Sequence, residues 1–314
     1  MIFSKKNKSV NHFILAAPRS GTTWLQRLLN AHPEVCCLER RLFGEYADFV
    51  QDDGQDRPRL RVTLDKYVHS MLLHHGYPKK DKHTLTQAFI KTLNKVERSH
   101  FGKHVIVDKI TPYVNTAETV LEQLNTFFPN SKLIYLVRDG RDVLTSGVFH
   151  WFNKQPADAE LTKFERARRK QFLEGDTFKG RFFQDKEIEQ WAGEWMQPLQ
   201  TIQNAKKSHD AKIIFYEDLL TDTEATLSEC LSFLGVKRTS GILKTCLEHG
   251  RFSTMSSGRK QGEAKPDAHV RKGISGDWKN YFTYADGKLF SELTKNTLVD
   301  FGYEENANWF ERLR

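Results

Sequence analysis

Short apolar runs rich in β-branched residues alternate along this chain with longer segments of helical periodicity. Four such pairs follow one another: residues 12–17 with 22–33, 104–109 with 115–128, 132–137 with 141–152, and 211–216 with 222–235. Strands that alternate with helices favour a mostly parallel sheet covered by helices on both faces. The sequence therefore predicts an α/β fold, and we expect a single domain over residues 1–314.

Two stretches, residues 40–103 and 153–190, interrupt this alternation. Both are charged and rich in helix-forming residues, and neither contains a repeat or a low-complexity tract. We therefore expect helical insertions into the α/β domain. Insertions of this kind commonly carry binding residues, so we expect them to shape a substrate site.

Composition limits the compartment and the partners. No window reaches the roughly 18 consecutive apolar residues of a membrane span, and the apolar run at 12–17 is too short for a signal-peptide core. The four cysteines have no spacing typical of zinc ligands or of a disulfide framework. We therefore expect a cytoplasmic protein with no transmembrane segment and no metal. The net charge of +8 favours anionic partners in general.

The sequence APRSGTTW, at residues 17–24, stands between the first expected strand and its helix. Backbone N–H groups and the helix dipole bind phosphate at such a junction. Compared with the phosphate loop of ATP-hydrolysing proteins, the segment keeps Gly21 and Thr23 but has Thr22 in place of the lysine. Arg19 supplies a positive charge instead. This pattern indicates an anion site without a dedicated Mg²⁺ partner; a simple connecting turn is the alternative.

The sequence RDGRDVLTS, at residues 138–146, suggests a second anion site. Arg138 follows the expected strand 132–137, and Ser146 lies in the early turns of the next helix. Arginine can make bidentate charged hydrogen bonds, and serine can add a donor. A capping and salt-bridge arrangement is the alternative. Two anion sites at successive strand ends favour a ligand that is phosphorylated at both ends.

A third segment, RKGISGDWKNYFT at residues 271–283, completes a known pattern. Two cations followed by glycine can hold a phosphate with side chains and backbone together. The three segments, in this order, resemble the family of sulfotransferases that depend on 3′-phosphoadenosine 5′-phosphosulfate (PAPS). The resemblance implies a P-loop-like parallel sheet flanked by helices, with helical insertions forming the acceptor site.

The resemblance also assigns cofactor-binding positions. APRSGTTW matches the family's 5′-phosphosulfate loop, Arg138 and Ser146 match its 3′-phosphate pair, and Trp24, Tyr216 and Phe252 match its adenine contacts. The complete set is Arg19, Ser20, Gly21, Thr22, Thr23, Trp24, Arg138, Ser146, Tyr216, Phe252, Arg271, Lys272 and Gly273. Each aromatic residue, taken singly, would more often belong to a core.

Sulfuryl transfer needs a base for the acceptor and positive charge near the leaving phosphate oxygen. Arg19 and Lys109 are the expected cations. Lys109 lies in DKITP, where cytosolic members of the family carry a histidine base that is absent here. Members that act on protein tyrosine use a glutamate, which aligns with Arg40, one residue beyond Glu39. We expect Glu39 to be the base; a surface carboxylate paired with Arg40 or Arg41 is the alternative. The other candidates are Asp108, Glu45 and His150.

The expected reaction is the transfer of the sulfuryl group from PAPS to an acceptor hydroxyl or amine, with release of adenosine 3′,5′-bisphosphate (PAP). The acceptor, whether small molecule, lipid, sugar or peptide, is not specified by the motifs. A nucleotide kinase and a non-catalytic basic protein that binds nucleic acid or acidic glycan are the alternatives; no reader motif for nucleic acid is present. The family's dimer motif would fall on residues 279–288, where Tyr284 and Lys288 depart from it.

Overall fold

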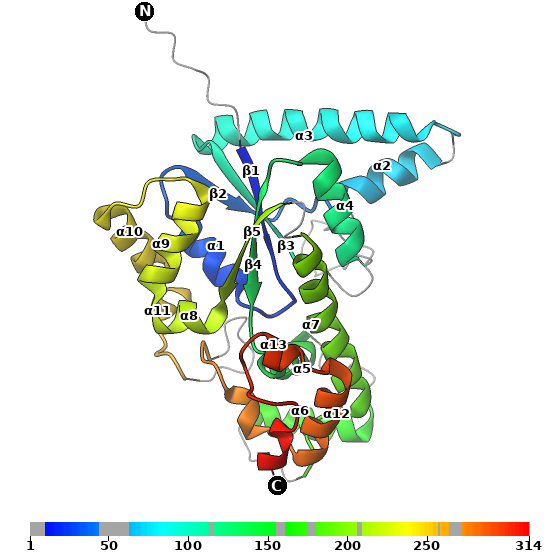
Figure 1. The fold of residues 1–314 in the computed structure, drawn as a ribbon, viewed down its shortest axis with the longest axis vertical. Helices are drawn as coiled ribbons and strands as arrows, with labels where there is room; N and C mark the ends of the chain where they lie inside the picture. The colour runs from blue at the N-terminus through cyan, green and yellow to red at the C-terminus, as the bar shows by residue number, and fades with distance from the viewer. Residues whose placement is uncertain are drawn as a thin grey trace, which may run out of the picture.

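The computed structural model describes residues 10–43, 63–73, 75–112, 116–154, 161–174, 180–205, 209–256, 258–263 and 272–313. The centre of the fold is a parallel five-stranded sheet in the order β2-β3-β1-β4-β5 (Figure 1). Its strands are β1 (Val10–Leu15), β2 (Val35–Leu38), β3 (Val105–Ile110), β4 (Lys132–Val137) and β5 (Asp210–Phe215). The predicted α/β class with a parallel sheet is confirmed.

The sequence pattern indicated four strands, and β2 is a fifth strand that it did not indicate. It is four residues long, and it pairs with β3 so that Leu38 lies opposite Asp108. Its two cysteines, Cys36 and Cys37, are buried, and all four cysteines of the chain are free thiols. A run this short carries no detectable period, so only the pairing with β3 identifies it as a strand.

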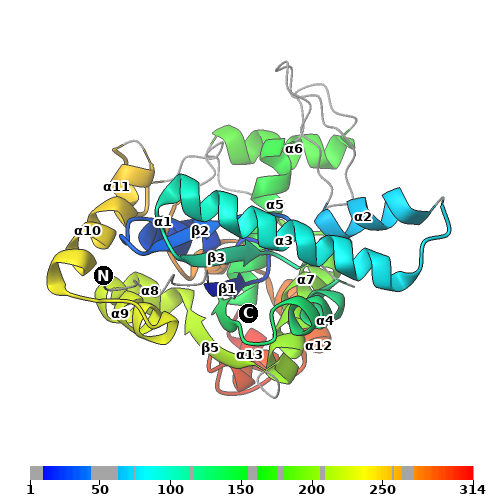
Figure 2. The ribbon, with the colours of Figure 1, turned by 90° about the horizontal axis from the view of Figure 1, so that it is seen from above.

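Helices cover both faces of the sheet (Figures 1 and 2). Alternate residues of β1 belong to different cores: Ile14 packs with α1, α9 and α10 on one face, and Phe13 packs with α4 and α7 on the other. A strand buried on both faces must be apolar throughout, which explains the continuous apolar runs in the sequence. The helices that begin outside the two interrupting stretches, together with α7, are α1 (Thr22–Asn30), α4 (Ala117–Phe127), α5 (Gly140–Lys154), α7 (Asp185–Ala205), α8 (Tyr216–Thr221), α9 (Thr223–Leu234), α10 (Ser240–Gly250), α11 (Phe252–Met255), α12 (Tyr284–Thr294) and α13 (Thr297–Asp300), with short 3₁₀ turns η1 (Asp277–Asn280) and η2 (Trp309–Leu313).

The two interrupting stretches contain helices, as expected. The first holds α2 (Leu64–Leu73) and α3 (Lys79–Phe101), which form a hairpin extending from the body of the protein (Figure 1). The second holds α6 (Lys163–Glu174) and the start of α7. Residues 44–62, 74, 155–160 and 175–179 of these stretches lie outside the described residues.

Helix α6 is attached to its neighbours by the buried guanidinium of Arg168. This group makes two hydrogen bonds to the carboxylate of Glu187 in α7, at 3.1 and 2.9 Å. It also lies 5.0 Å from the ring centroid of Phe152 in α5 and 4.9 Å from that of Phe182. A buried charge is tolerated when it is paired and packed in this way. Arg168 therefore gives the second insertion a defined position.

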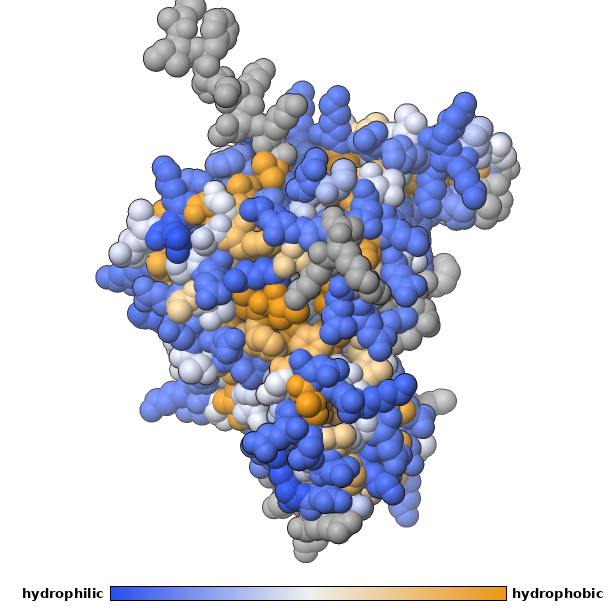
Figure 3. Space-filling view, viewed as in Figure 1, coloured by the Kyte–Doolittle hydropathy of each residue, from blue (hydrophilic) through white to orange (hydrophobic). Residues whose placement is uncertain are grey.

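Strand β5 forms one edge of the sheet and is only partly covered. Its residues Ala211, Lys212 and Ile213 are half-buried. Figure 3 shows apolar surface in the middle of the face on which β5 lies in Figure 1.

One buried histidine couples the sheet to pH. His12 in β1 is 3% exposed, and its Nδ1 accepts a hydrogen bond from the backbone N–H of Lys132 at 3.0 Å. Burial, assisted by the charge of Lys132, lowers the pKa of His12 to about 4. Because its pKa in the unfolded chain is near 6.5, the unfolded state binds the proton first as the pH falls.

We therefore expect His12 to lower the free energy of unfolding by about 2 kcal/mol between about pH 7 and about pH 4.5. Urea unfolding of the wild type and of His12→Asn at both pH values isolates this contribution. Asparagine keeps a hydrogen-bond acceptor but does not titrate. Equal pH dependence in the two proteins would contradict the assignment.

Candidate functional site

The carboxyl ends of three adjacent strands converge on one place. Leu15 of β1 lies opposite Tyr135 of β4, and Val137 of β4 lies opposite Phe215 of β5. The loop before α1, the turn that contains Arg138, and Tyr216 at the start of α8 therefore meet at this edge of the sheet. Ligands of parallel α/β sheets bind at such strand ends, where the strand order reverses direction.

The loop between β1 and α1 is built around two left-handed residues. Arg19 has φ 66° and Gly21 has φ 92°. A Cβ on Gly21 would lie 2.6 Å from the ring of Tyr216, so this position requires glycine for both its backbone and its neighbour. The hydroxyl of Ser20 is buried and, within the described part of the chain, has no hydrogen-bond partner. An unpaired buried hydroxyl beside a helix N-terminus suits an anionic ligand.

The guanidinium of Arg138 is the centre of the site. Its Nη1 donates to the carbonyl oxygen of Arg19 at 3.0 Å, and its Nη2 donates to the carbonyl oxygen of Ile274 at 3.1 Å. The guanidinium also lies 4.5 Å from the ring centroid of Tyr216. Its buried Nε has no partner among the described residues. Arg138 thus holds three segments together, and its Nε is still available as a donor.

The two anion sites that the sequence indicated are in direct contact. Nε of Arg19 donates to the hydroxyl of Ser146 in α5 at 3.2 Å. The sequence had suggested clusters that bind opposite ends of one ligand; the structure instead brings the side chain of the loop arginine to the second cluster. The left-handed backbone at Arg19 directs its side chain toward α5.

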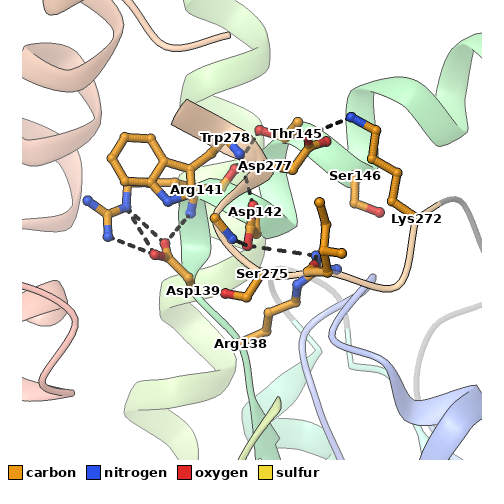
Figure 4. Close-up of polar contacts among 12 residues, drawn as sticks. Arg138, Asp139, Arg141, Asp142, Thr145, Ser146, Lys272, Ser275, Asp277 and Trp278 are labelled. Atoms are coloured by element: carbon orange, nitrogen blue, oxygen red, sulfur yellow. Dashed lines mark hydrogen bonds and ion pairs between the residues drawn. The ribbon is translucent and has the colours of Figure 1, made fainter. Parts of the chain in front are cut away.

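The third segment approaches the same place. Gly273 has φ 67°, and a Cβ there would lie 2.4 Å from the ring of Phe252 in α11. The ammonium of Lys272 pairs with the carboxylate of Asp277 at 2.7 Å. Figure 4 shows residues 272–278 beside the first turns of α5. Arg271 lies outside the described residues.

The aromatic residues expected at the adenine also gather here. Trp24 lies edge-on to Tyr216, with ring centroids 5.9 Å apart, and its Nε1 donates to the carbonyl oxygen of Gly250 at 2.8 Å. Gly250 is two residues before Phe252 in the chain. Trp24 and Tyr216 are thus in contact with each other, and Phe252 adjoins Gly273.

A second cluster lies at the ends of β2 and β3. The register that sets Leu38 opposite Asp108 places Glu39 beside Lys109. Oε2 of Glu39 is 2.8 Å from Nζ of Lys109, and the Glu39 side chain is about one-third exposed, at 34%. A carboxylate and a cation are therefore paired at the strand ends, with the carboxylate accessible.

The next residue, Arg40, points into the protein. Its backbone N–H and its Nε contact the carboxylate of Asp108 at 2.9 and 3.1 Å, and its Nη1 donates to Asn94 of α3 at 2.8 Å. Burial raises the pKa of Asp108, and the opposing effect of Arg40 is smaller. Asp108 is fully buried, and its carboxylate is already engaged by Arg40, so it is not accessible to an acceptor. Of the other base candidates, Glu45 lies outside the described residues and His150 is half-buried in the later turns of α5.

Sequence reasoning missed the carboxylates that support the site. Asp142 accepts hydrogen bonds from the backbone N–H groups of Gly276 and Trp278, at 2.7 and 3.0 Å. Glu217 accepts from the backbone N–H of Asp139 at 3.1 Å and from the hydroxyl of Tyr303 at 3.0 Å. The salt-bridge alternative for the motif at residues 138–146 is present between Arg138 and Asp142, whose side chains lie 3.8 Å apart. The contacts with residues 276 and 278 have no signal in the sequence.

Among the described residues, no group of three or more histidines, cysteines, aspartates or glutamates is arranged to hold a metal ion. Within the same residues, none of the helices has the length and apolar character needed to cross a bilayer.

Comparison with known proteins identifies relatives of one kind. A family model described as "Sulfotransferase domain" matches residues 11–302. "Sulfotransferase 2A6" of Mus musculus is 28% identical over 307 residues, which cover 94% of this chain and 86% of that protein. "Sulfotransferase 2A1" of Mus musculus is 29% identical over 310 residues, with the same coverage of both chains.

Two solved structures share the fold. One is mouse sulfotransferase SULT7A1 complexed with PAP, with a TM-score of 0.52 at 18% identity over 97% of this chain and 89% of that chain. The other is the sulfotransferase domain of the Synechococcus PCC 7002 olefin synthase, with a TM-score of 0.51 at 17% identity over 96% of this chain and 98% of that chain.

The buried pair of Arg40 and Asp108 gives a stability prediction. Arg40→Met leaves the carboxylate of Asp108 buried without its charged partner, which costs about 3–5 kcal/mol of unfolding free energy. The double variant Arg40→Met with Asp108→Leu removes both charges, and we expect it to recover most of that loss. Urea denaturation of the three proteins measures the difference. Equal losses in the single and double variants would contradict the pairing.

Proposed function

We propose that this chain, which belongs to the sulfotransferase domain family, transfers the sulfuryl group of PAPS to an acceptor hydroxyl or amine and releases PAP. The observation that carries the proposal is the junction of Arg19, Arg138 and Ser146 at the ends of β1 and β4. Fixed positive charge at adjacent strand ends suits a nucleotide with two anionic groups.

The site residues fit such a nucleotide. Ser20 and Arg138 each present a buried donor atom without a partner in the described part of the chain. Gly21 keeps the loop backbone close to Tyr216, where a side chain would intrude. PAPS supplies a sulfuryl group that is already activated by its link to phosphate, so no metal is needed in the proposed mechanism.

We assign one role to each group of residues. The 5′-phosphosulfate is held by the loop residues Arg19, Ser20, Gly21, Thr22 and Thr23. The 3′-phosphate is held by Arg138, Ser146, Arg271, Lys272 and Gly273. The adenine is held by Trp24, Tyr216 and Phe252. Lys272 would exchange its contact with Asp277 for one with the phosphate.

Glu39 is the proposed base, and Lys109 is a proposed electrostatic partner at the reacting end. The side chain of Arg40 is held by Asp108 and Asn94, so it does not act at the reacting end. Because Glu39 is next in the chain to this buried residue, it faces the opposite side, where it meets Lys109 at 2.8 Å and remains accessible. This geometry favours Glu39 over the aligned Arg40. Arg19 and Lys109 would stabilise charge that develops as the acceptor attacks.

The rival functions lack support in the site. A nucleotide kinase of the P-loop type needs a lysine where this chain has Thr22. A protein that binds nucleic acid through charge alone does not need the left-handed glycine against Tyr216 or the buried donors at Ser20 and Arg138.

The remaining expectations are less specific. The insertion helices α2, α3 and α6 are proposed to shape the acceptor site, and residues 1–314 to form one domain. The free state of all four cysteines supports the cytoplasm as the compartment. Lys288 pairs with Glu292 within α12, so we expect no dimer through residues 279–288.

Calorimetry with three nucleotides tests the function. We expect PAP and PAPS to bind with micromolar or tighter affinity without metal, and ATP with Mg²⁺ to bind far more weakly. Replacing both Arg19 and Arg138 by methionine should weaken PAP binding by about 100-fold or more, since each removes charged hydrogen bonds. The matched control, Lys186→Met with Lys288→Met, changes the net charge equally at exposed side chains away from the site. Retention of affinity in the first double variant, or failure of the wild type to bind PAP, would refute the proposal.

Turnover tests the reacting end. We expect Glu39→Gln to lower kcat by about 10²–10⁴-fold, because the acceptor loses its general base, while PAP affinity stays within about twofold. Lys109→Ala should likewise lower kcat far more than PAPS affinity. The acceptor for these assays is the unsulfated form of the product that becomes labelled when the protein is incubated with radiolabelled PAPS and an extract of its source. Near-normal turnover of Glu39→Gln would make the assignment wrong.

A further inference from the structure

Residues 272–278 reach the candidate nucleotide site through contacts with the first turns of α5. Oδ2 of Asp142 accepts the N–H of Gly276 at 2.7 Å, and Oδ1 accepts the N–H of Trp278 at 3.0 Å. Nη2 of Arg138 donates to the carbonyl oxygen of Ile274 at 3.1 Å. Figure 4 shows Arg138, Asp142 and Trp278 together. Three backbone groups of one short segment are thus held by two side chains of α5 and the turn before it.

The opposite side of this segment rests on a neighbouring loop. The carbonyl oxygen of Lys272 accepts from the N–H of Gly262 at 2.9 Å, and that of Gly273 accepts from the side chain of Gln261 at 2.7 Å. Residues 264–271, which precede the segment, lie outside the described residues. Asp142 and Arg138 connect the segment to the sheet edge where Ser146 and Arg19 lie. The hydroxyl of Ser275, 3.5 Å from Oε1 of Glu217, and the ring centroid of Trp278, 3.9 Å from the guanidinium of Arg141, add two further contacts.

Asp142 itself does not face the ligand. Its side chain is completely buried, at 0% exposure, and it lies 3.8 Å from Nη2 of Arg138. Two N–H donors and one guanidinium surround the carboxylate, so its charge is balanced and does not repel an anion at the neighbouring surface. The same carboxylate orients Arg138 and the backbone of residues 274–278.

We propose that Asp142 is a positioning residue for the 3′-phosphate of the nucleotide. It holds residues 272–276 against α5, so that Lys272 and the backbone at Gly273 stand on the same side as Arg138 and Ser146. The residue binds no ligand atom; it determines whether the groups that do so are assembled. This inference rests on the proposed function, since it concerns the same nucleotide.

A positioning role makes a selective prediction. Asp142→Asn keeps the size of the side chain, but its amide turns one acceptor into a donor that opposes a backbone N–H, so the segment is released. We expect the dissociation constant of PAP to rise about tenfold or more, which is about 1.4 kcal/mol. Adenosine 5′-phosphate lacks the 3′-phosphate and should bind the variant within about twofold of the wild type. Calorimetry with these two nucleotides measures both constants.

The matched control is Asp286→Asn. Asp286 is also buried, accepts from the backbone N–H of Thr283 at 2.8 Å and pairs with Arg181 at 2.6 Å, but it caps α12 and makes none of these contacts with residues 272–278. We expect it to lower the unfolding temperature without changing the ratio of the two dissociation constants. A change that reflects only general destabilisation would affect both variants alike.

The outcomes separate the two proposals. Equal weakening of both nucleotides by Asp142→Asn, or no weakening of either, overturns the positioning role while the proposed function stands. A wild type that does not bind PAP overturns the proposed function and the inference together. If Asp142→Asn does not fold, Asp142→Glu serves instead: it keeps the charge but is one methylene longer, and it should displace the segment and weaken PAP selectively. Unchanged selectivity in that variant overturns the inference.

Discussion

The buried guanidinium of Arg138 is the interaction on which the site depends. It contacts the carbonyl oxygen of Arg19, the carbonyl oxygen of Ile274 and the ring of Tyr216. It therefore joins the loop after β1, the end of β5 and the segment of Ile274, which is 136 residues beyond Arg138 in the chain. Hydrogen bonds to charged donors are stronger than neutral ones. Because burial limits the positions open to the guanidinium, the three segments must adopt one arrangement around it.

This arrangement follows from the parallel sheet. Parallel strands place all their carboxyl ends at the same edge, so neighbouring strand ends come together whatever the distance between them in the sequence. The order β2-β3-β1-β4-β5 puts the anion loop after β1 between the ends of β3 and β4. The cluster of Arg19, Arg138 and Ser146 therefore lies on the β4 side, and the Glu39–Lys109 pair lies on the β3 side. The strand order places the loop of Arg19 between the two clusters, which suits the proposed transfer from a bound nucleotide to a second substrate.

Most of the fold could be predicted from the sequence, and part of the site could not. Strands buried on both faces are long apolar runs, so β1, β3, β4 and β5 were detectable, whereas the four residues of β2 carry no period. The loop glycine and the two arginines stand in local motifs. The sequence does not reveal that the side chain of Arg40 points into the protein, and only its contacts with Asp108 and Asn94 show this. The contact of Arg19 with Ser146 depends on a left-handed backbone at a residue that is not glycine, which a single sequence does not reveal.

The buried carboxylates explain how a site for anions can contain so many acidic residues. Burial is the largest effect on the pKa of Asp142 and of Glu217, and with the nearby charge of Asp139 it raises both pKa values. Arg138 opposes this rise at Asp142, and hydrogen bonds oppose it at Glu217. Both carboxylates accept hydrogen bonds from backbone N–H groups of the turns that form the site. In the proposed site, these carboxylates hold the amide and guanidinium donors in place, and the donors would face the ligand. A site with the cations alone would repel its own segments before any ligand arrived, because like charges in a low-dielectric region are not screened by water.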